Sequence, residues 1–357
     1  MQVKTLKQML LHMNAIVVRN PVLPILENVM FNNGKMIVTN IQTWGFIDVS
    51  DNVPVENTFL LPFRKLKDAV STLKADDEVE IGSTGILING DVEFKMAPSG
   101  EIKDFPKPPE DGKDKVFPLE SAVLTEILKT YAYASNDELR PAMTGVGINS
   151  TDVVGTDGHM LRRAKHNVKE IKRSSRFKAS GNSGAPFILP NITKILRRVV
   201  KTDAKLRFAN QNRVWISFGE EITICVRLVD ERYPVYENVI PYDLEHTFIV
   251  DRKLFTDAIH SADIAANDIT HEVRLDFTEN TVNVSSHDLD MDTSFATNVP
   301  CKGSGIIKIG FNARFILKVL KDDPTGEDTV SIQCNAPNHA AMIDGILVMP
   351  VMLNNYV

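Results

Sequence analysis

The chain has 357 residues, of which 43% are hydrophobic and 24% are charged, and its formal net charge is −6 at pH 7. This length suffices for two or three domains, each with its own core. No apolar run reaches the roughly 18 residues that a membrane-spanning helix needs. The N-terminal stretch lacks a long apolar segment and a small-residue cleavage site, so we expect no signal peptide and a cytoplasmic location. The acidic balance argues against indiscriminate nucleic-acid binding.

The predicted elements, taken in order, repeat one cycle three times: helix, strands, a basic helix, then more strands. The helices are predicted at 3–13, 62–74, 119–134, 190–201, 252–266 and 311–321. The strands are predicted at 25–31, 35–39, 79–81, 86–88, 92–96, 144–148, 153–155, 206–208, 213–218, 222–228, 273–277 and 281–285, with final strands after residue 321 up to Leu353. The stretch 98–118 is rich in Pro, Gly and charge and reads as a linker. The fold class is therefore α+β, with three similar domains at 1–117, 118–245 and 246–357.

One helix in each cycle combines an apolar face with a basic face. In the middle copy, Pro190 is predicted in the first turn, Ile195 and Val199 face the core, and Arg197 and Arg198 face outward. The three stretches 61–74, 187–201 and 310–321 hold eleven of the 40 Lys and Arg residues but only one of the 46 acids. The rest of the chain then has 29 basic and 45 acidic residues, a net charge of −16. A basic face is often only a solvated face, but three equivalent ones favour a shared anionic ligand.

Four motifs in the right order resemble bacterial sliding clamps, the beta subunit of DNA polymerase III. They are Leu23-Pro24-Ile25-Leu26 with Asn28; Arg140-Pro141 with Gly145, then Thr156-Asp157-Gly158-His159 and Leu161; Arg232-Tyr233-Pro234 with Tyr236 and Val239-Ile240-Pro241; and Val348-Met349-Pro350 with Leu353. The resemblance covers essentially the whole chain. It implies a head-to-tail homodimer whose six clamp domains close a ring, with helices lining the hole.

The resemblance also implies the partners of the inner helices. Their cations would contact duplex DNA without reading base edges, so the ring could slide. The implied DNA-binding residues are Arg19, Lys67, Lys194, Arg197, Arg198, Arg314 and Lys318. No GxxxxGK[ST] motif is present, so ATP for ring opening would come from a separate clamp loader. We expect no cofactor and no enzymatic activity.

A hydrophobic groove for peptides of the replicative polymerase and other partners is implied as well. Its matching positions are Met143, Thr156, Gly158, His159, Met160, Leu161, Pro234, Val239, Leu347, Met349, Pro350, Val351, Met352 and Leu353. Methionine suits such a site because its thioether repacks around different ligands. Family members usually have Arg at Met160 and often at Met352, and here four residues follow Leu353. We therefore hypothesise a divergent partner set, such as that of a phage; micromolar binding of host-type clamp-binding peptides would contradict this.

The seam of the implied dimer places Phe94 and Met96 of the first domain against Ile264 and Ala265 of the third. Ala265 replaces a larger apolar residue, so the contact there is expected to be weaker. Phe94 on an alternating strand could equally be a core residue. The runner-up function is a clamp-fold scaffold that binds peptides without stable ring closure on DNA, because that role needs only the groove.

Catalytic and metal-binding interpretations have weaker support. Asp157 and His159 lack a third ligand or a nucleophile at a suitable spacing. Asp288, Asp290 and Asp292 imitate the start of a calcium loop, but the sixth position is not Gly and the twelfth is not Glu. The cysteines, Cys225, Cys301 and Cys334, form no CxxC pair and are predicted to be buried.

Overall fold

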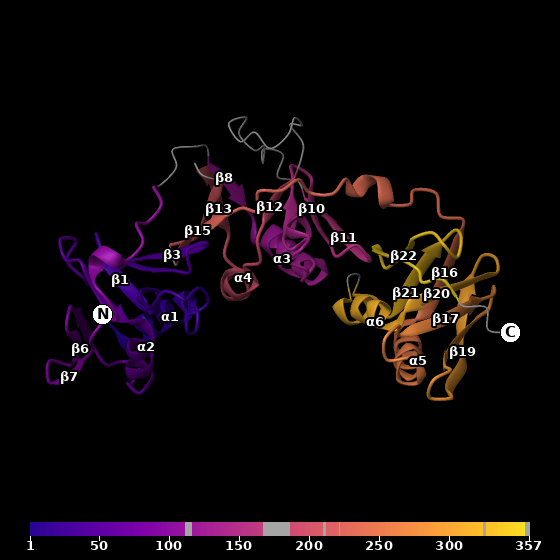
Figure 1. The fold of residues 1–357 in the computed structure, drawn as a ribbon, viewed down its shortest axis with the longest axis horizontal. Coiled ribbons are helices and arrows are strands. Elements are labelled where there is room, and N and C mark those ends of the chain that lie inside the picture. Colours follow the sequence, from indigo (N-terminus) through magenta and orange to yellow (C-terminus); the bar gives the residue numbers. More distant parts are fainter. Residues whose placement is uncertain (111–115, 167–185, 210–211, 221, 324–325, 354–357) are drawn as a thin grey trace. The chain divides into compact units, whose positions relative to one another are not determined.

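The computed structural model describes residues 1–357 except 111–115, 167–185, 210–211, 221, 324–325 and 354–357. The chain forms two compact units, which are described separately (Figure 1). The first contains Met1–Tyr131, Gly145–Val153 and Lys165–Arg232; the second contains Ala132–Thr144, Val154–Ala164 and Tyr233–Val357. The division of the sequence into three domains at residues 117 and 245 stays a prediction.

The first unit is built on an eight-stranded antiparallel sheet with strand order β4-β1-β2-β3-β15-β14-β13-β8. Its strands are β1 (Asn28–Asn32), β2 (Lys35–Thr39), β3 (Thr43–Asp48), β4 (Phe59–Pro62), β8 (Val116–Leu119), β13 (Ala204–Ala209), β14 (Arg213–Phe218) and β15 (Ile222–Arg227). A three-stranded sheet contains β5 (Val79–Gly82), β6 (Gly85–Ile88) and β7 (Val92–Lys95). In addition, β9 (Val146–Ile148) pairs with β12 (Phe187–Leu189), and β10 (Asp152–Thr156) runs from the first unit into the second.

Four helices belong to the first unit: α1 (Val3–Met13) contacts α2 (Phe63–Ser71), and α3 (Ser121–Thr130) contacts α4 (Thr193–Val199). Helix α1 approaches β3 closely at Gly45, where a Cβ would lie 3.0 Å from Met13 Sδ. Because side chains alternate along a strand, Trp44 and Phe46 point to the opposite face. There Phe46 stacks on Trp215 with ring centroids 5.0 Å apart. The sheet therefore carries helices on one face and an aromatic cluster on the other.

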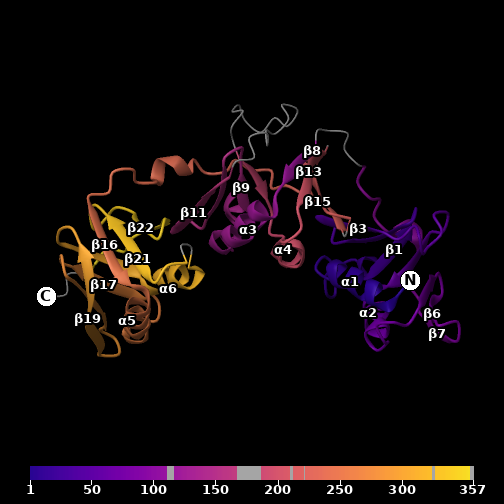
Figure 2. The ribbon, with the colours of Figure 1, turned by 180° about the vertical axis from the view of Figure 1, so that it is seen from behind.

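The second unit contains the strand series β11-β23-β22-β21-β16-β19-β18-β17-β20, in which neighbouring strands are antiparallel. Helices α5 (Arg252–Ala265) and α6 (Ala313–Asp322) contact each other (Figures 1 and 2). The strands are β11 (Met160–Lys165), β16 (His246–Asp251), β17 (Glu272–Phe277), β18 (Thr281–Asp288), β19 (Thr293–Gly303), β20 (Ile307–Asn312), β21 (Thr329–Cys334), β22 (Ala341–Ile343) and β23 (Ile346–Val348).

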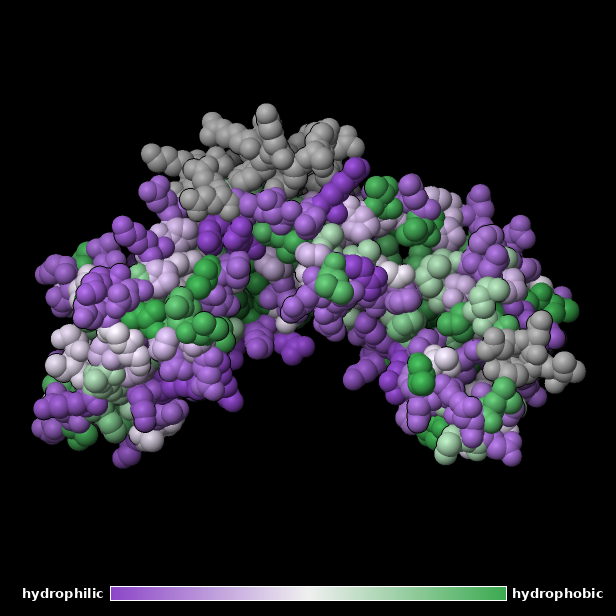
Figure 3. Space-filling view, in the orientation of Figure 1, coloured by the Kyte–Doolittle hydropathy of each residue, from purple (hydrophilic) through white to green (hydrophobic). Residues whose placement is uncertain are grey.

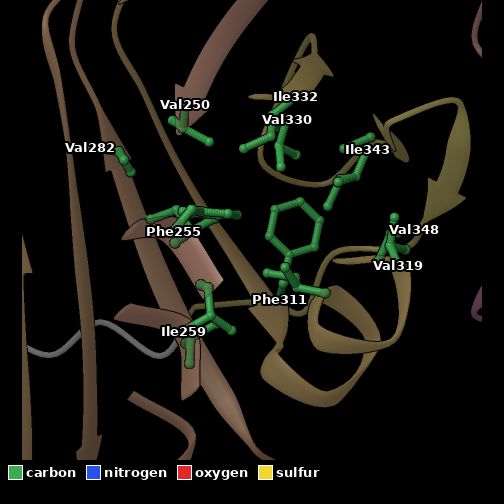
Figure 4. Close-up of a cluster of buried hydrophobic side chains, with 14 of the residues drawn as sticks. Val250, Phe255, Ile259, Val282, Phe311, Val319, Val330, Ile332, Ile343 and Val348 are labelled. Atoms are coloured by element: carbon green, nitrogen blue, oxygen red, sulfur yellow. The ribbon is translucent and has the colours of Figure 1, made fainter. Parts of the chain in front are cut away.

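The core of the second unit lies between α5, α6 and these strands. Phe311 of β20, Phe255 of α5 and Val319 of α6 are each fully buried, and Figure 4 shows their side chains converging. Phe248 stacks on Phe277 at 4.3 Å between ring centroids. Short 3-10 helices occur at Pro24–Glu27, Ile102–Asp104, Tyr131–Tyr133, Pro141–Met143 and Tyr236–Val239. The α+β fold class is confirmed, and all three cysteines are free and buried, as predicted.

Many element boundaries match the sequence expectations, but the starts of the second and third basic helices do not. Helix α4 begins at Thr193, so the prediction that Pro190 lies in its first turn is wrong. Phe187–Leu189 pairs with β9 instead, and Pro190 follows that strand. Phe311 likewise belongs to β20, which pairs with β17. A strand precedes each basic helix, directly for α2 and α6 and after three residues for α4. The apolar residues of that strand continue the apolar pattern of the helix, so the pattern alone places the start of the helix too early. Strands β3, β4, β8, β11, β16 and β19 were not anticipated.

Candidate functional site

A cationic hollow of about 1120 Å³ lies among α1, α2, α4 and the segment after α1. Its lining includes six Lys and Arg residues and a single acid, Asp68. The six are Arg19, Arg64, Lys67, Lys194, Arg197 and Arg198, and we call this surface the basic hollow. Among the described residues, none of the six forms an ion pair. In the space-filling view, hydrophilic side chains gather around α4 (Figure 3). Unpaired like charges so close together favour an anionic ligand.

The six cations of the basic hollow are held to different degrees. Arg19, Lys194 and Arg197 are exposed. By contrast, Arg198 donates a hydrogen bond to the Leu11 carbonyl, and burial lowers the pKa of its guanidinium, which still stays charged. Lys67 Nζ lies 3.4 Å from Asn14 Oδ1, which is a long hydrogen bond. Three predicted DNA contacts are therefore exposed, and two others are already engaged within the protein.

The segment that leads into helix α4 is anchored by Tyr131, which is not among the predicted site residues. The Tyr131 hydroxyl lies 3.2 Å from the carbonyl oxygen of Leu189 and 2.6 Å from that of Pro190. Burial raises the pKa of Tyr131 well above its usual value, so it remains a donor. These two carbonyls lie in the segment that leads into α4. The anchor therefore sets where the basic face of α4 begins.

Helix α6 carries the predicted cations of the second unit. Its N-terminus is capped by Asn312, whose Oδ1 accepts a hydrogen bond from the Arg314 amide at 2.9 Å. Arg314 is exposed, whereas Lys318 is half-buried with its Nζ 4.9 Å from the centre of the Tyr133 ring. This distance is suitable for a cation–π interaction. The partner of Lys318 was not foreseen, because Tyr133 is far away in sequence.

The predicted groove residues all lie in the second unit, and several of them, including His159, are exposed. The His159 ring stacks on Phe315 of α6 at 5.6 Å between centroids, and the His159 carbonyl accepts a hydrogen bond from the Met349 amide at 2.8 Å. Val239, Met349 and Met352 are 52%, 37% and 76% exposed. Gly158 is exposed, and Met143, Pro234, Pro350, Val351 and Leu353 are half-buried. Met349 thus places exposed apolar area next to the aromatic pair of His159 and Phe315.

Four other predicted groove residues are buried. Thr156, Met160, Leu161 and Leu347 are at most 7% exposed. The Thr156 hydroxyl donates to the Met160 carbonyl at 2.8 Å, and Met160 pairs with Val348 across β11 and β23. Met160 packs into the core of the second unit. Its side chain therefore supports the groove from below.

Two residues near the groove were missed as site residues. Phe315 of α6 is half-buried and stacks on His159. Arg140, noted only as part of a motif, approaches Gly158: a Cβ there would lie 3.1 Å from an Arg140 guanidinium nitrogen. Asp137 holds that guanidinium at 2.8 Å. The Arg140-Pro141 motif was the sequence feature from which a role for Arg140 near the groove could have been predicted.

The predicted seam residues lie on the surfaces of their respective units. Phe94 of β7 is 37% exposed, which excludes the core alternative considered for it. Phe94 and Met96 line a hollow of about 770 Å³ beside α2. In the second unit, Ile264 at the end of α5 is 76% exposed, and Ala265 is half-buried. In each unit, at least one apolar seam residue is thus open to a partner.

The catalytic and metal-binding alternatives gain no support from the geometry. Asp157 Oδ1 accepts hydrogen bonds from the amides of His159 and Met160, so it closes a turn. Asp288 plays a similar role for Asp290. Within the part of the chain that the structure describes, no three His, Cys, Asp or Glu side chains are grouped to hold a metal ion. The described helices also include none that is long and apolar enough to cross a membrane.

Comparisons with known proteins point to a single family. Residues 237–346 match the DNA polymerase III beta subunit, C-terminal domain. The chain is 24% identical over 312 residues to the beta sliding clamp of Synechococcus elongatus, covering 83% of this chain and 81% of that protein. It is 22% identical over 363 residues to the beta sliding clamp of Pseudomonas aeruginosa, covering 95% of both.

Solved structures agree over the full length. The crystal structure of the DNA polymerase III subunit beta from Pseudomonas aeruginosa matches with a TM-score of 0.83 at 20% identity and covers 99% of each chain. The beta subunit from Thermotoga maritima matches with a TM-score of 0.81, also at 20% identity, covering 99% of this chain and 98% of that one. At this identity, the matches show a common fold.

Proposed function

We propose that this chain, a divergent relative of the bacterial beta sliding clamps, is itself a DNA sliding clamp. It encircles duplex DNA and keeps a replicative polymerase attached, without catalysing a reaction of its own. The basic hollow is the observation that carries this proposal. A protein with a net charge of −6 gathers six cations and one acid into a single surface, which suits a polyanion.

The exposed cations are the proposed DNA contacts. Arg19, Lys194 and Arg197 in the first unit and Arg314 in the second can each approach a phosphate without breaking an internal contact. Lys and Arg contacts to phosphates are independent of sequence and weaken as salt rises. Such contacts hold DNA loosely enough for the protein to slide. Retention then depends on the closed ring more than on affinity.

Ring closure is proposed to come from a second copy of the chain. In the first unit, β7 is an edge strand in the sheet order β5-β6-β7. In the second unit, β19 pairs with β16 only at residues 301–303, so among the described strands Thr293–Pro300 has one open edge. Open strand edges are ready to pair with another chain. The exposed Phe94 and Ile264 would add apolar contact, and two such seams would close the ring.

The surface around His159 is proposed to bind short peptides of the polymerase, the ATP-driven clamp loader and other replication proteins in the cytoplasm. Val239, Met349 and Met352 supply exposed apolar area, while buried Met160 and Leu347 keep the backbone in place. The small side chain of Ala265 at the proposed dimer seam leads to an alternative function. If the small side chain leaves the seam too weak, the chain serves as a peptide-binding scaffold without stable closure on DNA.

Light scattering over a dilution series decides between these functions. A mass near twice 39.8 kDa that persists on dilution is expected for the clamp. A monomer at every concentration, together with intact peptide binding, would favour the scaffold.

Retention on nicked circular DNA tests the contacts themselves. Lys194→Glu with Arg197→Glu should release the DNA, whereas the matched pair Lys205→Glu with Arg227→Glu, both exposed on strands, should not. Equal retention by the two double variants would contradict the role of the basic hollow.

A further inference from the structure

Arg197 and Arg198 are adjacent on α4, yet they are in different environments. Arg197 is exposed and lines the basic hollow. Arg198 is half-buried, and its Nη1 donates to the carbonyl of Leu11 near the end of α1. The bond joins two helices that are 187 residues apart in sequence. Sequence reasoning treated both arginines as equivalent DNA contacts.

The Leu11 carbonyl needs this donor because of the way α1 ends. The Asn14 amide bonds to the Leu10 carbonyl at 2.9 Å, and the Ala15 amide turns back to His12 at 3.2 Å. Ile16 then bonds to Met13. Among the described residues, no backbone amide reaches Leu11. Carbonyls at a helix C-terminus carry partial negative charge and lack partners within the helix, so a cation is favoured there.

We propose that Arg198 is a positioning residue and not a DNA contact. Its guanidinium fastens α4 to the C-terminal end of α1 and so sets the spacing between Lys194 and Arg197 on one side of the hollow and Arg19 on the other. Binding a phosphate would require Arg198 to release the Leu11 carbonyl. The inference rests on the proposed function for the identity of the ligand, but the link between the helices is independent of it.

Lys318 provides an independent parallel in the second unit. Its Nζ lies 4.9 Å from the centre of the Tyr133 ring, while Arg314, one turn earlier on α6, is exposed. Tyr133 belongs to the 3-10 helix Tyr131–Tyr133. A cation held over an aromatic ring is likewise committed within the protein. In both units, one cation of the basic helix faces the ligand and another holds the helix in position.

The test compares Arg197→Gln with Arg198→Gln. Glutamine removes the charge but keeps a side-chain N–H donor. Affinity of the full-length protein for a linear duplex is measured against salt concentration. Arg197→Gln should make the log–log slope shallower by about 0.9, the value for one lost phosphate contact. Arg198→Gln should leave the slope unchanged, and Arg198→Ala should weaken binding equally at every salt concentration. The same loss of slope in both Gln variants would overturn the proposal.

Amide hydrogen exchange without DNA tests the link between the helices directly. Arg198→Ala should speed exchange in Thr193–Val199 by about tenfold or more, as expected for loss of a hydrogen bond to a charged group. Arg197→Ala should leave it unchanged. Equal exchange in the two variants would refute the positioning role. If wild-type protein shows no salt-dependent duplex binding, the proposed function fails, and the exchange result alone decides the role of Arg198.

Discussion

The basic hollow of the first unit and the groove of the second place opposite demands on their residues. In the hollow, the proposed contacts Arg19, Lys194 and Arg197 are exposed and need only carry charge. In the groove, Met160 and Leu347 are buried, and they act through the backbone that they support. A charged surface can therefore lose one member and keep its shape, whereas the groove cannot. The expected effects of substitution follow this difference.

Replacing a buried groove residue should have the largest effect. Met160→Ala should reduce the free energy of unfolding by about 2–5 kcal/mol, since it leaves a cavity in the core. Chemical denaturation measures the change. Met352→Ala, at a position that is 76% exposed, is the matched control and should cost less than about 0.5 kcal/mol. Equal losses in the two variants would mean that Met160 does not support the groove.

Alkaline pH should weaken the core of the second unit. Burial raises the pKa of Cys334 in the second unit to about 11, above the ordinary thiol value of 9.0. The folded state thus holds this proton more tightly than the unfolded state. Stability is present in full below pH 9 and is lost as pH rises toward 11. Cys334→Ala should flatten this part of the pH profile by roughly 3 kcal/mol. An unchanged profile would contradict the burial argument.

A smaller effect is expected at the anchor of α4. Tyr131→Phe removes the donor to the Leu189 and Pro190 carbonyls and should cost about 1–3 kcal/mol of stability. DNA affinity should fall as well, because the start of α4 is no longer fixed. Tyr242→Phe is the control, since Tyr242 is 75% exposed and its bond to Glu237 is long at 3.4 Å. A stable Tyr131→Phe protein with normal affinity would show that the anchor is dispensable.

The smallest expected effect on stability comes from substitutions of the cations on α6. Lys318→Ala should lower stability by about 0.5–1 kcal/mol through loss of the contact with Tyr133. Arg314→Ala should leave stability unchanged but reduce the salt dependence of DNA binding. Thermal unfolding and duplex titration measure the two effects. The reverse result would assign the DNA contact to Lys318.

Much of the fold could be predicted from local pattern. Helix 3–13 and the strands at 35–39 and 213–218 match because their periodicity is uninterrupted. Boundaries were missed where a strand leads directly into a helix, as at Phe311, because both elements place apolar residues at the join. The basic residues could be identified, but their division into exposed and engaged members could not. The partners of Arg198 and Lys318 are a distant carbonyl and a distant ring, and neither leaves a signal in the neighbouring sequence.

The burial of all three cysteines has a practical consequence for watching such a ring open. Native thiols that are shielded from solvent react slowly, and burial raises the pKa of Cys301 and Cys334, which reduces the reactive thiolate further. A cysteine introduced at an exposed position would therefore be labelled selectively in the unmodified background. Phe94→Cys and Ile264→Cys, at 37% and 76% exposed positions, would carry a fluorophore pair across the proposed seam. Energy transfer between them would then report opening and closing in single molecules.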